Sequence, residues 1–352
     1  MPGARSRRSS VPLDEFALID LIRSRFGGLA PEIVAGIGDD AAVVRASGTA
    51  PWIFTTDLLA DGIHFSLATT SLVDLGYKAG AANLSDLAAM GAHPRYLLVD
   101  VAIPSRLSSR DVLRLYRGLS DVCRPHDVRI IGGDTSGSRE GLFIAITAIG
   151  RAAGARAILR RGAQPGDRVF VSGFLGDALG GLILTQMHPR RVLGRRLPFR
   201  HRAYLLRRHR RPECRVALGT ELGRLRLATA MIDLSDGLSA DLPHLCEASR
   251  VGAQVDLAAL PVSAALRGLA AATSRPLIDL ALQGGEDYEL LFATRPHDSE
   301  AVRVLARHLH VQVTEIGRIV PWKLGRQVRE QSGFLRPLPM TGYRHFRTSH
   351  RP

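Results

Sequence analysis

Aspartates that stand beside glycines or at the ends of short apolar runs are the residues of this sequence best suited to chemistry. They occur in five segments: GIGDDAA (Asp39, Asp40), TTDLL (Asp57), NLSDLAAMGA (Asp86), GGDTS (Asp134) and IDLSDGLSADL (Asp233, Asp236). A carboxylate at a strand end is accessible and rigidly aimed, and Mg²⁺ prefers a few such oxygens together with phosphate oxygens. One Asp-Gly pair is typical of a turn. Five such segments in a chain with 33 acidic residues indicate a site for metal ions and phosphate.

The segment GIGDDA also fits the glycine pattern of dinucleotide-binding folds, in which GxGxx[G/A] follows a strand. Both variable positions are aspartate here, and two carboxylates would repel a pyrophosphate unless cations lay between them. We therefore reject a dinucleotide site at this segment. The need for cations leads back to a metal–phosphate centre.

Two further glycine-rich segments could hold an anion. VSGFLGDALGG has the pattern of a strand, a glycine turn and a helix start, which is a general arrangement for phosphate binding. LQGGEDYELLF places Glu286 and Asp287 between a glycine pair and an apolar strand. Each segment also fits a purely structural role, as a helix start and as a charged turn, and the sequence leaves both interpretations open.

Patterns of several other enzyme classes are missing from the sequence. There is no GxxxxGK[ST], and neither of the two lysines, Lys78 and Lys323, stands in a glycine loop, so a P-loop kinase is excluded. There is also no paired HRD and DFG of a protein kinase, no GxSxG hydrolase elbow and no HExxH zinc helix.

Basic charge is concentrated in arginines. The formal net charge is +14, and eleven arginines fall between Arg190 and Arg215. Such a segment could attract nucleic acid. We favour a solvated helix face instead, because no aromatic residues for base stacking are interleaved with the arginines. The sequence therefore does not indicate a nucleic-acid partner.

The three cysteines, Cys123, Cys214 and Cys246, are far apart and odd in number, which predicts reduced thiols. No apolar stretch of the kind found in a signal peptide follows the basic N-terminus. No apolar run approaches the ~18 residues of a membrane span. We expect a cytoplasmic enzyme with no membrane partner.

Apolar runs of strand length alternate with helical patterns along most of the chain. Ser71 is a plausible N-cap for a long small-residue helix that contains Asp86. The composition changes near residue 151, where a segment rich in glycine and alanine precedes a new strand. We expect a disordered basic tail over residues 1–12, an N-terminal α/β domain over 13–150 and a C-terminal α/β domain over 151–346.

Taken in order, eight segments resemble the thiamine-monophosphate kinase family, in the superfamily that includes aminoimidazole ribonucleotide synthetase and selenophosphate synthetase. The resemblance runs from about Phe16 to Phe346. The segments are GIGDDAA, TTDLLADGIHF, GYKAGAANLSDLAAMGA, IIGGDTS, RRGAQPGDRVFVSG, IDLSDGLSADLPH, GGEDYELLF and GYRHF.

This resemblance implies a two-domain aminoimidazole ribonucleotide synthetase-like fold with α/β mixed sheets and an ATP site between the halves. It also implies a homodimer formed through the N-terminal domains. The metal ligands would be Asp39, Thr55, Thr56, Asp57, Asp86, Asp134, Asp233 and Asp236, holding Mg²⁺. The ATP contacts would be Gly133, Arg160 and Ser235, and the thiamine-phosphate contacts would be His64, Glu286 and Tyr343. His126 and Ser136 depart from the family pattern, and the departure at His126 leaves the adenine contact open.

The implied activity is ATP-dependent phosphorylation of thiamine monophosphate to thiamine diphosphate. ATP and a phosphate acceptor repel each other by several kcal/mol at a moderate effective dielectric constant, so cations and the carboxylates that hold them are required. Because the acceptor phosphate is already ionised at neutral pH, no general base is needed, and positioning with charge neutralisation is sufficient. The alternatives are a related enzyme with another acceptor, and a non-catalytic nucleotide- or RNA-binding protein.

Overall fold

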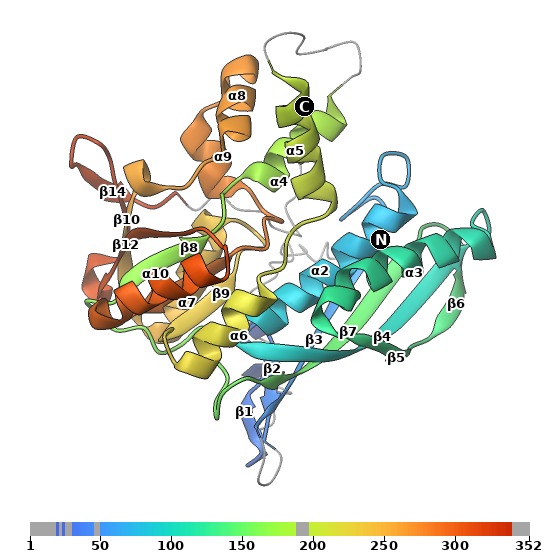
Figure 1. Cartoon of the computed structure of the whole chain (residues 1–352), viewed down its shortest axis with the longest axis horizontal. Helices are drawn as coiled ribbons and strands as arrows, with labels where there is room; N and C mark the ends of the chain where they lie inside the picture. The colour runs from blue at the N-terminus through green and yellow to red at the C-terminus, as the bar shows by residue number, and fades with distance from the viewer. Residues whose placement is uncertain (1–18, 21–22, 25–29, 46–49, 188–196, 340–352) are drawn as a thin grey trace, which may run out of the picture.

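A computed structural model describes residues 19–20, 23–24, 30–45, 50–187 and 197–339. Within these ranges the chain forms two seven-stranded sheets with helices packed on them (Figure 1), which confirms the predicted α/β architecture with mixed sheets. The expected basic tail, Tyr343 and part of the Arg190–Arg215 segment lie outside the described residues.

The first sheet has the strand order β1-β2-β3-β7-β4-β5, with β6 paired to β4. Most neighbours are antiparallel, whereas β5 and β6 run parallel to β4. The strands are β1 (Ile33–Ala35), β2 (Ala42–Val44), β3 (Trp52–Ala60), β4 (Ala92–Pro104), β5 (Arg129–Gly132), β6 (Thr135–Ser138) and β7 (Phe143–Ala152).

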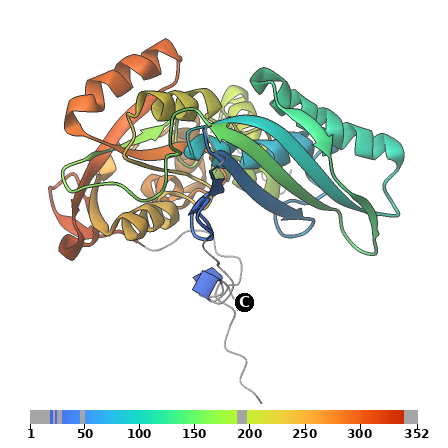
Figure 2. The ribbon, with the colours of Figure 1, turned by 90° about the horizontal axis from the view of Figure 1, so that it is seen from below.

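Helices α2 (Leu72–Ala89) and α3 (Ser109–Cys123) lie on one face of this sheet (Figure 2). The predicted N-cap is confirmed, because Ser71 accepts a hydrogen bond from the Asp74 N–H. The two helices approach closely through glycines. A Cβ at Gly76 would lie 1.9 Å from a backbone oxygen of α3, so the small residues of α2 are needed for this contact. Close packing fixes α2, and with it Asp86.

The strands β3 and β7 pair over their full length, and their side chains alternate between two faces. Thr55 and Asp57 point inward toward α2, and Thr56 points outward. The outward face carries Leu58 and Phe143, which are exposed. This face has no helix upon it among the described residues.

The second sheet has the order β14-β13-β10-β12-β8-β11-β9, which places β9 at an edge. Its strands are β8 (Arg168–Ser172), β9 (Ala230–Asp233), β10 (Val251–Asp256), β11 (Leu290–Thr294), β12 (Val313–Pro321), β13 (Arg326–Arg329) and β14 (Leu335–Pro337). Its helices are α4 (Asp177–Gln186), α5 (Phe199–Arg210), α6 (Val216–Leu225), α7 (Leu238–Ser249), α8 (Ala264–Thr273), α9 (Leu277–Gln283) and α10 (Ser299–His308).

One hydrophobic cluster lies between the two sheets and takes side chains from both. Side chains of α6, α10 and the inner face of the second sheet belong to the same buried cluster as those of α2, whereas α7 and α9 form a separate cluster on the opposite face. Gly219 of α6 packs on α2 so tightly that a Cβ would lie 2.1 Å from the Ala88 carbonyl oxygen. This junction holds α2 beside the end of β9.

In the described part of the chain, the helices are too short or too polar to cross a lipid bilayer.

A candidate metal–phosphate site between the two sheets

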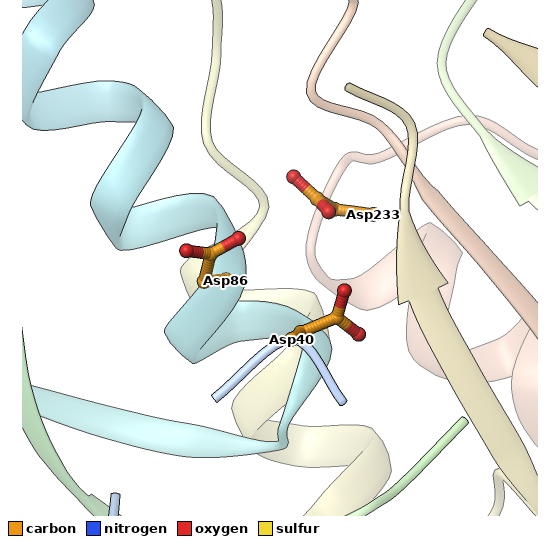
Figure 3. Close-up of side chains that lie close together, drawn as sticks. All are labelled: Asp40, Asp86 and Asp233. Atoms are coloured by element: carbon orange, nitrogen blue, oxygen red, sulfur yellow. The ribbon is translucent and has the colours of Figure 1, made fainter. Parts of the chain in front are cut away.

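Three carboxylates from different parts of the chain converge where the sheets meet (Figure 3). Asp40, Asp86 and Asp233 each offer an oxygen atom, and these atoms lie within 4.8 Å of one another. We call these three residues the acidic cluster. Asp40 stands in the loop before β2, Asp86 in the last turn of α2 and Asp233 at the end of β9. The first sheet and its helix therefore supply two members, and the second sheet supplies one.

Hydroxyl groups orient two of these carboxylates. Thr55 Oγ1 donates to Asp86 Oδ2 at 2.6 Å, and Ser85 Oγ donates to Asp233 Oδ2 at 2.7 Å. Because Thr55 points inward from β3 and Ser85 precedes Asp86 on α2, both donors are held by regular structure. The remaining carboxylate oxygens are free to face a common ligand.

One guanidinium group partly balances the acidic cluster. Arg160 donates from Nε and Nη2 to Asp40 Oδ1, at 3.1 and 2.6 Å. The Asp40 side chain is only 1% exposed, yet its Oδ2 has no hydrogen-bond partner among the residues that the structure describes. A buried carboxylate oxygen without a partner is costly. It is a position at which a cation would be bound favourably.

Burial and mutual repulsion make these carboxylates hard to ionise without a cation. Burial and then Asp40 raise the pKa of Asp233 to about 8. Burial, followed by the charges of Asp57, Asp233 and Asp40, also raises the pKa of Asp86 well above its usual value. A divalent cation would remove both causes of instability, because it replaces lost hydration and offsets the repulsion. The donor set, carboxylates only, suits Mg²⁺.

Two of the other predicted metal ligands border the acidic cluster. Burial raises the pKa of Asp57 to about 6, and the charge of Asp57 contributes to the raised pKa of both Asp86 and Asp233. Asp39 accepts a hydrogen bond from the Arg160 N–H at 3.2 Å, and burial followed by Asp40 raises its pKa to about 6. Their metal contacts stay predictions.

Three more predicted ligands have their side chains elsewhere. Thr56 points to the outer face of the first sheet, where it accepts a hydrogen bond from Thr147 Oγ1. Asp134 is exposed between β5 and β6, and Asp236 stands in the loop that precedes α7. The structure does not bring these three into the acidic cluster, and their metal contacts also stay predictions.

The residues predicted to contact ATP stand at three different positions in the fold. Arg160 reaches it directly through Asp40. Ser235 is exposed two residues after Asp233, and its carbonyl accepts the Glu286 N–H at 2.7 Å. Gly133 has φ of 142°, and a Cβ there would lie 1.9 Å from the Val99 carbonyl oxygen, so this turn requires glycine.

The predicted acceptor contacts come from separate elements. His64 Nδ1 accepts the Ala60 N–H at 3.0 Å, so in the neutral ring Nε2 carries the proton and can donate. Glu286 lies in the turn between α9 and β11, where its Oε1 is 2.5 Å from Lys78 Nζ. Burial would raise the pKa of Glu286, but Lys78 and His209 together outweigh burial and bring it to about 2.

Sequence reasoning missed the roles of Asp40 and Ser85. The GIGDDAA segment was recognised, but Asp39 rather than Asp40 was predicted as the ligand. Adjacent residues in this loop cannot be told apart by composition, since their orientation depends on how Arg160 docks from 120 residues away. Ser85 precedes a recognised aspartate, and only its place on the helix face indicates a role.

The glycine-rich cradle at residues 171–181 is filled by the protein itself. The Asp287 carboxylate accepts the N–H groups of Gly176 and Ala178, at 2.5 and 2.9 Å, at the start of α4. Of the two open interpretations, the structure favours a helix cap for this segment. The segment LQGGEDYELLF thus supplies the capping anion.

The arginine-rich segment is less solvated than expected. Arg208 is 4% exposed, and both Arg208 and Arg215 pair with the fully buried carboxylate of Glu289 at 2.7 and 2.6 Å. Arg211 pairs with Asp74 at 2.6 Å. Arg208 and Arg215 serve internal ion pairs, which leaves them unavailable to a nucleic acid. Our prediction of a solvated helix face is therefore wrong for these two arginines.

Comparison with known proteins agrees with this geometry. The family model for "AIR synthase related protein, N-terminal domain" matches residues 38–152, and the one for "AIR synthase related protein, C-terminal domain" matches residues 164–328. A thiamine-monophosphate kinase of Bacillus subtilis is 33% identical over 95% of this chain and 100% of its own length.

Solved structures of the same kind superpose on the chain. A complex of AaThiL with AMPPCP and TMP is 32% identical, with a TM-score of 0.78 over 95% of this chain and 97% of that chain. The thiamine-monophosphate kinase of Stenotrophomonas maltophilia K279a is 38% identical, with a TM-score of 0.72 over 94% of this chain and 99% of that chain. This chain belongs to the thiamine-monophosphate kinase family, within the AIR synthase-related proteins.

Proposed function

We propose that the protein transfers the γ-phosphoryl group of ATP to thiamine monophosphate and so makes thiamine diphosphate. Membership of the thiamine-monophosphate kinase family supports this reaction. The observation that carries the proposal is the acidic cluster: three buried or partly buried carboxylates, one with an unpartnered oxygen, placed between the two halves of the chain. Two polyanionic substrates need such a site to approach each other.

The proposal assigns Mg²⁺ to the acidic cluster. Asp40, Asp86 and Asp233 would hold it, with Asp57 at its border and Thr55 orienting Asp86. Bound there, Mg²⁺ supplies charge neutralisation for the phosphates of ATP. The unpartnered Asp40 Oδ2 and the raised pKa values of Asp86 and Asp233 support this assignment.

The chain's own residues position the substrates. Arg160, already held by Asp40, would meet the phosphates of ATP with the donors not used in that ion pair. Gly133, whose Cβ would clash with the Val99 backbone, would contact the nucleotide from its exposed turn, and Ser235 is exposed two residues after Asp233. An ionised acceptor phosphate attacks directly, so no protein nucleophile and no phosphorylated enzyme are involved.

A second group of residues, separate from the ATP contacts, would recognise thiamine monophosphate. Its thiazolium is cationic and its tail is a phosphate. His64 could donate from Nε2, Glu286 offers a carboxylate, and Tyr343 would offer a ring face for cation–π contact. These roles follow the family resemblance, and Tyr343 lies outside the described residues.

A homodimer is also part of the proposal. The outer face of the first sheet presents Leu58, Tyr96 and Phe143, which are 58%, 36% and 38% exposed. An apolar sheet face of this kind is typical of a protein–protein contact. Two copies packed through this face would bury it. We further propose a division into two domains near residue 151 and a cytoplasmic location, which the three free cysteines support.

An acceptor panel tests the proposed reaction. The purified chain would be incubated with ATP and Mg²⁺ and, separately, thiamine monophosphate, formylglycinamidine ribonucleotide or selenide, with release of ADP and formation of product measured. Of the three acceptors, we expect only thiamine monophosphate to be phosphorylated. The Asp86→Asn variant should phosphorylate it about a hundredfold more slowly or not at all. Turnover with another acceptor and none with thiamine monophosphate would contradict the proposal.

A further inference from the structure

A buried lysine links the two halves of the molecule beside the acidic cluster. Lys78 is one of two lysines in the chain, stands in the middle of α2 and is only 4% exposed. An isolated ammonium group would not be stable there. Its partner is Glu286, whose Oε1 lies 2.5 Å from Lys78 Nζ. This ion pair joins α2 to the turn that connects α9 with β11.

Helix geometry places Lys78 on the same stripe as a residue of the site. Ser85 follows Lys78 by seven residues, about two turns, so both face the second sheet. Ser85 binds Asp233, and Lys78 binds Glu286. One face of α2 therefore binds two carboxylates from the second half of the chain: Asp233 of the acidic cluster, through Ser85, and Glu286, through Lys78.

The backbone of the turn is fixed by the same part of the second sheet. Glu286 has φ of 63°, which is uncommon for a residue with a side chain. Its N–H donates to the Ser235 carbonyl oxygen, and the Tyr288 N–H donates to the Leu234 carbonyl oxygen. The turn is thus tied to the two residues that follow Asp233. Strain held by such contacts is typical of positions that aim a side chain at a site.

Three titratable groups face the Glu286 carboxylate: Lys78 from α2, His209 from α5 and Tyr288 from the same turn. His209 Nδ1 is 3.4 Å from Oε2, but burial lowers the pKa of His209, so its ring is neutral near neutral pH. Burial also raises the pKa of Tyr288, which is therefore neutral. Lys78 is the one full positive charge among these three.

We infer that Lys78 is a positioning residue for the acceptor: it keeps Glu286 ionised, and it cancels the negative charge that Glu286 would otherwise place beside two incoming phosphate groups. The inference rests on the proposed function. The Glu286 side chain is 29% exposed, so part of the carboxylate remains open to a ligand. With Lys78 present, the acceptor meets a fixed hydrogen-bond acceptor without added repulsion of its own phosphate.

Removing the ammonium group should make acceptor binding depend on pH. In Lys78→Met the buried carboxylate has no strong cation partner, so the pKa of Glu286 rises and the group becomes protonated as pH falls. We expect KM for thiamine monophosphate to rise about tenfold to a hundredfold near pH 7, and to rise further toward about pH 5, because a hydrogen bond to a charged group is lost. In the unchanged protein the same KM should change less over this range, because only the acceptor phosphate, whose second pKa is about 6, and the carboxylates of the metal site take up protons there.

Two further variants separate this effect from simple damage. In Lys78→Met/Glu286→Gln no buried charge is left unpaired, so the protein should fold, and its KM should be close to that of Glu286→Gln and no more dependent on pH than that of the unchanged protein. Lys78→Arg keeps a cation but moves it, so we expect a smaller rise, about threefold to tenfold, without added pH dependence. KM for ATP should change less than KM for thiamine monophosphate in every variant.

The outcomes distinguish the inference from the function on which it rests. If the unchanged protein does not phosphorylate thiamine monophosphate, the proposed function is wrong. If it does, and Lys78→Met folds with the same KM for thiamine monophosphate as the unchanged protein at each pH, the inference is overturned. Should Lys78→Met fail to fold, an unchanged KM in Lys78→Arg, or a double variant that binds the acceptor better than Glu286→Gln, would overturn it.

Discussion

Two groups of buried carboxylates in this molecule are balanced in opposite ways. Glu289 is fully buried and accepts hydrogen bonds from Ser172, Arg208 and Arg215 at 2.5 to 2.7 Å. Burial alone would raise its pKa, but Arg215 and Arg208 outweigh burial and lower the pKa below its usual value. In the acidic cluster, three carboxylates share one guanidinium group.

The difference shows how a structural carboxylate can be told from one that awaits a ligand. Around Glu289 the protein matches negative charge with positive charge, since Arg208 and Arg215 pair with Glu289 and with Glu213, and both Glu289 carboxylate oxygens are satisfied. In the acidic cluster the protein leaves Asp40 Oδ2 without a partner and holds Asp233 at a pKa of about 8. Under the proposed function, a bound cation would supply the missing positive charge.

Neutralising one member of the acidic cluster should give the largest effect. Asp233→Asn and Asp86→Asn keep the side-chain shape but remove the charge that holds the metal ion. We expect kcat to fall about a hundredfold or more, with the fold retained. Steady-state rates at saturating ATP and thermal melts of the metal-free proteins would be measured together. Normal rates at limiting Mg²⁺ would exclude that residue as a ligand.

Neutralising Glu289 should lower the stability of the fold rather than remove a metal ligand. Glu289→Gln leaves Arg208 and Arg215 with only the more exposed Glu213 as a negative partner, so we expect a loss of about 3 kcal/mol in the free energy of unfolding. Urea denaturation would measure it, with Glu221→Gln, an exposed-pair variant on α6, as the matched control. If Glu289→Gln were as stable as the control, the contrast between the two groups would fail.

Stability of the metal-free protein should depend on pH in a defined direction. The folded state raises the pKa of Asp233 from 3.8 to about 8, so its contribution is fully present below about pH 4 and is lost as pH rises through about 8. Mg²⁺ should therefore raise the melting temperature more at about pH 8 than at about pH 5, where protons compete. Asp233→Asn should reduce this difference. An equal shift at both pH values would contradict the charge assignment.

Two neighbouring threonines on β3, Thr55 and Thr56, give the prediction with the smallest expected effect. Thr55 donates to Asp86, whereas Thr56 points to the opposite face. Thr55→Val removes one hydrogen bond worth about 0.5–1.5 kcal/mol, so the Mg²⁺ concentration for half-maximal rate should rise about twofold to tenfold. Thr56→Val should change it far less. The reverse order would show that the alternation along β3 does not select the metal-facing side chains.

Much of the site could be predicted because its residues stand in recognisable local patterns. Asp86 and Asp233 were identified from a small-residue helix and from a strand end, and the structure brings both into the acidic cluster. The α/β fold followed from alternating strand and helix patterns. Ser71 was recognised as the N-cap of α2.

The remaining features depend on contacts distant in sequence. Arg160, which binds both Asp39 and Asp40, joins residues about 120 positions apart, and the filling of the α4 cradle by Asp287 joins residues more than a hundred positions apart. The pairing of Arg208 with Glu289 is likewise long-range, which is why an arginine-rich helix was mistaken for a solvated face. Local composition carries no record of such partners.

Binding of Mn²⁺ in place of Mg²⁺ would show whether the acidic cluster holds a divalent cation. The full chain would be titrated with Mn²⁺ and followed by electron paramagnetic resonance of the free ion, alongside Asp40→Asn, Asp233→Asn and the surface variant Asp111→Asn. We predict that the unchanged protein and Asp111→Asn bind Mn²⁺ alike, whereas Asp40→Asn and Asp233→Asn bind it about tenfold or more weakly while remaining folded. Equal affinity in all four proteins would contradict the assignment of the cation to the acidic cluster.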